Sequence, residues 1–175
     1  MAFKNKIKKT SSLARPGKSG NVSGGHGGVK VGEPGGQGLI LVVDQDDWCR
    51  DFLCSVIKLL RCGDFHLVAS VPEGLTLMEE MVFDLIITDH KLPDFHRLVD
   101  LARSRYPLTQ IILLVQQRHQ PHPVFFLEQV ELVIKPPSLD DMVRKIRHAL
   151  HQKQLRQTEE EWRRLRQEAF RLFLG

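Results

Sequence analysis

Three charged residues, Asp44, Asp89 and Lys135, each stand at the end of a short apolar run in this chain of 175 residues. If the runs are parallel strands, their carboxyl ends meet at one edge of a sheet, which is where sites form in open α/β sheets. Carboxylates gathered there favour a hard cation such as Mg²⁺. An aspartate beside such a cation can attack phosphorus, and a lysine would neutralise the phosphoryl oxygens. The three residues therefore predict a phosphoryl-transfer site.

The acidic residues near Asp44 also fit a simpler interpretation. Gln45, Asp46 and Asp47 follow Asp44, and acidic residues at the start of a helix cap free N–H groups and favour the helix dipole. Asp89 could likewise be an ordinary loop residue. The coincidence of charged residues at three strand ends favours one shared site over these separate interpretations.

The apolar runs that must position these residues do not alternate with polar ones, which is typical of strands buried on both faces of a parallel sheet. There are five: Leu39–Val43, Leu67–Val71, Leu85–Ile87, Ile111–Val115 and Leu132–Ile134. Five strands that alternate with helices predict an α/β fold of three layers. The flavodoxin-like strand order 2-1-3-4-5 would make strands 1 and 3 neighbours, and so bring Asp44 beside Asp89.

Helical spacing marks the connecting segments, at about 46–62, 75–82, 98–102 and 143–150. Ser138 is the expected N-cap of the last helix, directly after Pro136-Pro137. The fourth connection is the exception, because Pro121 and Pro123 crowd its start and leave only about 124–129 for a helix.

The stretch from Leu39 to Leu150 resembles the receiver domain of bacterial two-component response regulators. The matching pieces are Leu41-Val42-Val43-Asp44, the run from Asp84 to Pro93 with its Asp-x-x-Leu-Pro spacing, Tyr106-Pro107 and Lys135-Pro136. The resemblance implies a flavodoxin-like fold, dependence on Mg²⁺, and a phosphoryl group received from a sensor histidine kinase or a phosphotransfer protein. A cytoplasmic signalling module, rather than an enzyme, is expected.

The resemblance also assigns roles by position. Asp89 is the implied phospho-acceptor and Lys135 the implied phosphate-sensing lysine. The implied metal ligands are Asp44, Asp89 and the backbone carbonyl of Lys91, with Asp46 helping if its loop shifts.

Four departures from the family pattern are visible. Gln45 stands where a second acid usually contacts the metal, which should weaken Mg²⁺ binding. Val115 replaces the Thr or Ser at the end of the fourth strand, and Leu132 replaces the switch aromatic on the fifth. The acceptor loop also lacks the glycine that commonly follows its proline. Two functions therefore stay open: a phosphorylated receiver with atypical signalling, or a degenerate receiver that binds partners without phosphorylation.

The net charge of +4 is unevenly distributed along the chain. Residues 1–38 carry seven Lys or Arg and one acid, a net of +6, and ten of the thirteen glycines, which predicts a disordered tail. Residues 39–150 carry 12 bases and 16 acids, a net of −4. Contact with nucleic acid is therefore expected only non-specifically, through the tail, and no apolar run is long enough to span a membrane.

The last 25 residues, 151–175, predict an amphipathic helix with a heptad seam. The seam residues are spaced 3, 4, 3, 4 and 3 apart: Leu155, Thr158, Trp162, Leu165, Ala169 and Leu172. This helix could fold back on the domain, join a second copy or another partner, or fray.

Two smaller features carry weaker expectations. Cys49, Cys54 and Cys62 are expected to be small buried side chains without disulfides. His90 adjoins Asp89 and could tune its surroundings, but an exposed loop position is the simpler expectation.

Overall fold

The computed structural model describes residues 38–117 and 123–174, with only the backbone described for 125, 126 and 174. The predicted disordered tail lies outside the described residues, apart from Gly38, which opens the first strand. No helix within the described ranges is long and apolar enough to cross a membrane.

Five strands form one sheet: β1 (Gly38–Val43), β2 (Gly63–Val68), β3 (Leu85–Asp89), β4 (Gln110–Gln116) and β5 (Val130–Lys135). The order is β2-β1-β3-β4-β5 and every neighbouring pair is parallel. The three central strands are almost wholly buried, which is why their sequences are unbroken apolar runs. The predicted flavodoxin-like sheet is confirmed.

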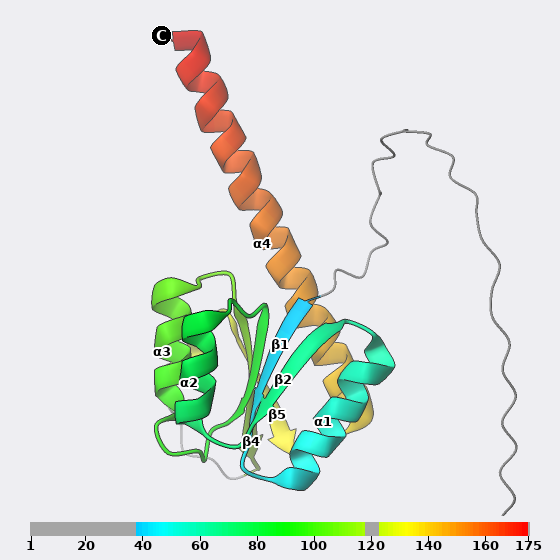
Figure 1. Ribbon diagram of the computed structural model, residues 1–175. Helices are drawn as coiled ribbons and strands as arrows, with labels where there is room; N and C mark the ends of the chain where they lie inside the picture. The colour runs from blue at the N-terminus through cyan, green and yellow to red at the C-terminus, as the bar shows by residue number, and fades with distance from the viewer. Residues whose placement is uncertain (1–37, 118–122, 175) are drawn as a thin grey trace, which may run out of the picture. The chain divides into compact units, whose positions relative to one another are not determined.

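Helices cover both faces of this sheet (Figure 1). Helix α1 (Asp47–Leu60) and the first part of α4 (Leu139–Leu174) pack on one face, and α2 (Val71–Glu80) and α3 (Phe95–Arg105) pack on the other. Each face therefore has its own apolar core. The strands are held between two layers of helix, so their carboxyl ends are fixed relative to one another.

The second strand lies earlier in the sequence than its apolar run predicts. The prediction was Leu67–Val71, but β2 ends at Val68 and Val71 begins α2. The physical reason is that β2 is an edge strand whose residues are mostly half-buried. Polar Asp64 and His66 are tolerated there, so the strand lacks the continuous apolar run of its neighbours.

A close approach of two glycines sets the start of β1 and β2. Gly63 has φ +143° and pairs with Gly38, whose N–H donates to the Cys62 carbonyl at 2.8 Å. A Cβ on Gly63 would lie 1.7 Å from the carbonyl oxygen of Gly38. Only glycine allows this backbone contact and conformation.

The connection between β4 and β5 contains one 3₁₀ turn, η1 (Pro123–Phe126), within its described part. No α-helix forms over 124–129, the short span that the crowding prolines left for one; Pro121 itself lies outside the described residues. Ile134 lies on the edge strand β5 and is exposed.

Helix α4 runs without a break from Leu139 to Leu174, so the predicted C-terminal helix is continuous with the last helix of the domain. Ser138 caps it as predicted, because its Oγ accepts a hydrogen bond from the Asp141 N–H at 3.2 Å. Every described side chain from Gln157 to Phe173 is exposed. The helix does not fold back on the domain, so this one of the three alternatives for the C-terminal helix is wrong.

Candidate functional site

The carboxyl ends of the strands open onto a cavity of about 760 Å³. Asp44 follows β1, Asp89 ends β3 and Lys135 ends β5, and all three line this cavity. The register explains their meeting: Val43 pairs with Thr88, so Asp44 and Asp89 occupy the next position on two neighbouring strands.

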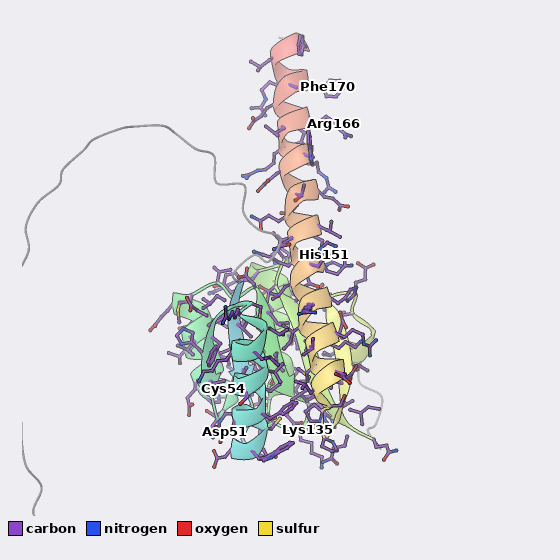
Figure 2. All side chains as sticks on the ribbon, turned by 90° about the vertical axis from the view of Figure 1, so that its right-hand side faces the viewer. Asp51, Cys54, Lys135, His151, Arg166 and Phe170 are labelled. Atoms are coloured by element: carbon purple, nitrogen blue, oxygen red, sulfur yellow. The ribbon has the colours of Figure 1, made fainter. Side chains whose placement is uncertain are left out.

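Lys135 bridges the two carboxylates. Its Nζ donates to Asp44 Oδ2 and to Asp89 Oδ2, each at 2.7 Å. Strand β4 separates β3 from β5, so the side chain must reach past one strand end, and the flexible four-carbon stem of lysine allows this. In Figure 2, Lys135 lies at the end of the sheet where α1 begins.

The charges around Lys135 keep it protonated. Burial acts to lower its pKa, but hydrogen bonds to Asp44 and Asp89 act more strongly together, and the net pKa is raised above the usual 10.5. The ammonium is therefore a permanent positive charge at this site at any physiological pH. Its side chain is 15% exposed, so its field is only partly screened by water.

Asp44 is fully buried, and its carboxylate is held on both oxygens. Oδ1 accepts from the Asp46 N–H at 2.9 Å, and Oδ2 accepts from Lys135. Asp46 also lines the cavity, but its side chain is exposed and caps α1 by accepting from the Trp48 N–H at 3.0 Å. The structure thus gives Asp46 the helix-capping role that the simpler sequence interpretation predicted.

Asp89 is almost completely buried and is also held on both oxygens. The Lys91 N–H donates to its Oδ1 at 2.8 Å, opposite the Lys135 contact on Oδ2. His90 Nδ1 lies 3.3 Å from Asp89 Oδ1 and 3.1 Å from the Leu114 carbonyl oxygen. The His90 side chain is 15% exposed, so the expectation of an exposed loop histidine is wrong.

A thiol lies beside Asp44. Cys49 on α1 is buried, and that burial, with a hydrogen bond to Asp44, raises the pKa of its thiol to about 12. It stays protonated and acts as a small polar packing group. All three cysteines are free, as expected, although Cys54 and Cys62 are only half-buried.

The structure also locates three residues that depart from the pattern of the receiver family. Gln45 lines the cavity with an exposed side chain, and Val115 is fully buried in the core at the end of β4. Leu132 is half-buried on β5. The described residues that line the cavity include no Ser or Thr, so none of them supplies a hydroxyl to the site.

Several lining residues were not predicted from the sequence. They are Trp48, Gln116, Gln117 and Pro137. The two glutamines directly follow the predicted fourth strand, so the strand-end rule that found Lys135 could have found them too. Trp48 is 59% exposed and stacks on Phe52, and an aromatic residue at a helix start gives no comparable signal.

The oxygen donors fit a hard divalent cation with a small protein ligand set. Asp44, Asp89 and Lys91 all line the cavity, and Mg²⁺ needs only one or two carboxylates because it keeps several waters. No group of three or more His, Cys, Asp or Glu residues within the described ranges is placed to hold a metal ion. The site therefore offers two buried carboxylates, with Gln45 and Asp46 at its exposed rim.

Comparisons with known proteins agree with this geometry. The chain is 31% identical over 120 residues to the response regulator protein FleR of Pseudomonas aeruginosa. The aligned residues cover 65% of this chain and 25% of that protein. The chain thus spans about a quarter of the length of that relative. No family model matches the sequence.

Solved structures show the same fold. A CheY-like receiver domain from Methanospirillum hungatei is 26% identical, with a TM-score of 0.59, and covers 69% of this chain and 98% of that one. The signal receiver domain of an HD domain-containing protein from Pseudomonas fluorescens has a TM-score of 0.61 at 23% identity, covering 74% and 98%.

Proposed function

The folded domain of this chain is a response-regulator receiver domain, and from that premise we propose that it accepts a phosphoryl group on Asp89. The donor would be the phosphohistidine of a sensor histidine kinase or of a phosphotransfer protein. The domain would act as a signalling module that passes on its state through protein contacts. It would not turn over a substrate as an enzyme does.

One observation carries the proposal: the Lys135 ammonium touches both Asp44 and Asp89 in a cavity open to a donor. In the step, an Asp89 carboxylate oxygen forms a bond to phosphorus. The bond from phosphorus to the donor nitrogen breaks, and its electron pair leaves with the histidine. Lys135 faces the added negative charge on the phosphoryl oxygens, because its Nζ already lies against the attacking carboxylate.

We further propose that Mg²⁺ assists at the same place. Asp44, Asp89 and the Lys91 carbonyl would hold it, with Asp46 as an outer oxygen donor. When bound, the cation adds positive charge where phosphoryl oxygens gather. Because Gln45 offers a neutral oxygen in place of an acid, we expect weak affinity.

The test is phosphorylation of the whole protein by a small acyl phosphate in the presence of Mg²⁺, followed by intact mass measurement. We expect one phosphoryl adduct that hydroxylamine removes, as it does from carboxyl phosphates. Asp89→Asn should abolish the adduct. Lys135→Met should slow its formation about a hundredfold, because it removes preorganised positive charge.

Asp94→Asn is the matched control, since Asp94 is an exposed acid in the same connection and lines no part of the cavity. It should leave the adduct unchanged. The proposal is wrong if the wild-type protein gains no adduct, or if Asp89→Asn keeps it.

A second candidate function is partner binding without phosphorylation. It is favoured because no Ser or Thr is among the described residues that line the cavity. Val115 presents only hydrocarbon at the end of β4, and Leu132 replaces an aromatic on β5. Both changes remove parts that usually couple a bound phosphoryl group to the domain surface. In this alternative the domain binds its partners regardless of phosphorylation, and the same experiment yields no adduct.

A further inference from the structure

The outer stretch of α4, residues 157–173, exposes more large apolar side chains than a solvated helix needs. Arg166 and Phe170 project from this part of the helix in Figure 2. The exposed large apolar residues from the point where α4 leaves the domain are Leu155, Trp162, Leu165, Phe170, Leu172 and Phe173, with exposed fractions of 46% to 88%. Helices in proteins owe most of their stability to the packing of an apolar face. Burial of these apolar side chains would therefore stabilise the outer stretch.

Four of these six side chains, Leu155, Trp162, Leu165 and Leu172, lie on one seam, and Phe170 and Phe173 lie beside it. Because α4 is continuous, the heptad spacing that the sequence shows is kept in space. Leu155, Trp162 and Ala169 take the first core position, and Thr158, Leu165 and Leu172 take the second. Such a seam is the surface by which two similar helices pack in a coiled coil.

We propose that this seam is covered by a second copy of the chain, in a parallel two-stranded coiled coil. The charges beside the seam select this occupant. Glu161 precedes Trp162 and Arg166 follows Leu165, so they occupy the two flanking positions that meet across a parallel pair. Glu161 of each copy would face Arg166 of the other, which gives two attractive contacts by symmetry.

The remaining flanking positions are compatible with the parallel arrangement. Gln154 would face Glu159 of the second copy, and Glu168 would face Phe173, so no like charges meet. In an antiparallel pair centred on Trp162 and Leu165, Glu161 would instead face Glu168. That contact is repulsive and occurs twice, while Glu159 would face Arg166 in an attractive contact that also occurs twice. The charges therefore cancel in the antiparallel form and favour the parallel form, whose charged contacts are all attractive.

The consequence is that both receiver domains would sit at the same end of the pair. The proposal does not rest on phosphoryl transfer, since the seam is exposed without it. The seam is about two and a half heptads long and includes Thr158, so the dimer should be weak and depend on concentration.

The test is sedimentation or light scattering of the full chain over a range of concentrations, without a phosphodonor. The mass of the wild-type protein should rise from 20.1 kDa towards that of two copies. Glu161→Arg and Arg166→Glu should each raise the dimer dissociation constant about tenfold, because two attractive contacts become repulsive. The double variant E161R/R166E should restore the wild-type value.

Matched controls fix the interpretation. Glu160→Arg makes the same charge change on the side of the helix opposite the seam and should leave dimerisation unchanged. Leu165→Glu places a charge in the seam and should abolish dimerisation. These positions are exposed, so the variants should keep the circular dichroism of the wild type.

Four outcomes would overturn the proposal. A wild-type mass that stays at one copy at every concentration would mean that no second copy covers the seam. A dimer that survives Leu165→Glu would lie elsewhere on the molecule. A tighter dimer with Glu161→Arg would mean an antiparallel pair, and a double variant that stays weak would exclude the Glu161–Arg166 contact.

Discussion

The two parts of helix α4 have opposite relations to the rest of the molecule. The inner stretch, residues 139–156, packs on the sheet and on α1 through Met142, Ile146 and Ala149, all buried. It also carries ion pairs to neighbouring segments, such as that from Lys153 to Asp84. The described side chains of the outer stretch are all exposed.

This difference arises within one uninterrupted helix, so secondary structure alone does not explain it. Both stretches are rich in residues that favour helices, and both have apolar side chains on one face. The inner stretch is stabilised because its apolar face is buried against the core. The outer stretch has the same kind of face, and none of the residues that the structure describes covers it, which is the pattern of an interaction surface.

The largest expected effect tests this contrast directly. Ile146→Ala should lower the free energy of unfolding by about 3 kcal/mol, because it leaves a cavity in a fully buried core position. Leu165→Ala makes a similar truncation on the outer stretch, where the side chain is 57% exposed. It should leave unfolding unchanged when measured by denaturant titration at a concentration where the protein is monomeric.

Equal losses in these two variants would contradict the comparison, since the outer stretch would then be packed within its own chain. Val143→Ala is a useful intermediate, because Val143 is half-buried against the same core. The free energy of unfolding that Val143→Ala loses should lie between the losses of Ile146→Ala and Leu165→Ala.

The sequence could predict the parts of the fold that depend on burial. Strands β1, β3 and β4 are buried on both faces, so their apolar runs identify them, and the charged residues that follow β1 and end β3 mark the site edge. The sequence pattern placed β2 too late because an edge strand needs no continuous apolar run. Local pattern is informative only where the environment is uniform.

The site shows the same limit. The meeting of Asp44, Asp89 and Lys135 could be predicted from parallel strand ends. The surroundings of His90 could not, because they depend on the Leu114 carbonyl, which the β3–β4 register brings close from 24 residues away. Such contacts come from tertiary pairing, which has no signal within the loop itself.

A substitution of Asp84, at the point where α4 leaves the domain, should have an effect of intermediate size on the free energy of unfolding. Asp84 Oδ2 accepts from the Leu39 N–H at 2.6 Å, and its other oxygen pairs with Lys153. Asp84→Ala should lower the free energy of unfolding by about 2 kcal/mol, because a partly buried backbone N–H loses its acceptor. Thermal or denaturant unfolding of the variant would measure this.

Lys153→Met separates the two contacts of Asp84. It removes the cation but keeps the acceptor for Leu39, so it should lower stability by less than about 1 kcal/mol. A loss as large as that of Asp84→Ala would mean that the ion pair to α4, rather than the hydrogen bond to β1, holds this corner.

The smallest expected effect is the pH dependence of the inner stretch. Glu131 on β5 pairs with Lys145 and His148 of α4. Burial acts to raise the pKa of Glu131, but the hydrogen bonds and charges of Lys145 and His148 outweigh it, and the net pKa falls below the usual 4.5. A carboxyl whose folded pKa is lowered contributes stability above its unfolded pKa and loses it as pH falls through the folded value.

The contribution of Glu131 should therefore be complete above about pH 4.5 and be lost as the pH falls through the lower pKa of the folded state. Glu131→Gln should lower the free energy of unfolding by about 0.5 kcal/mol at neutral pH, and the difference from the wild type should vanish in acid. Glu128 is the matched control. Its side chain is 92% exposed, and its ion pair with Arg156 is long, with 3.6 Å between the nearest nitrogen and oxygen atoms. Glu128→Gln should follow the wild-type stability curve at every pH. If Glu131→Gln does so as well, these ion pairs do not hold the inner stretch in place, and burial of its apolar face alone distinguishes it from the outer one.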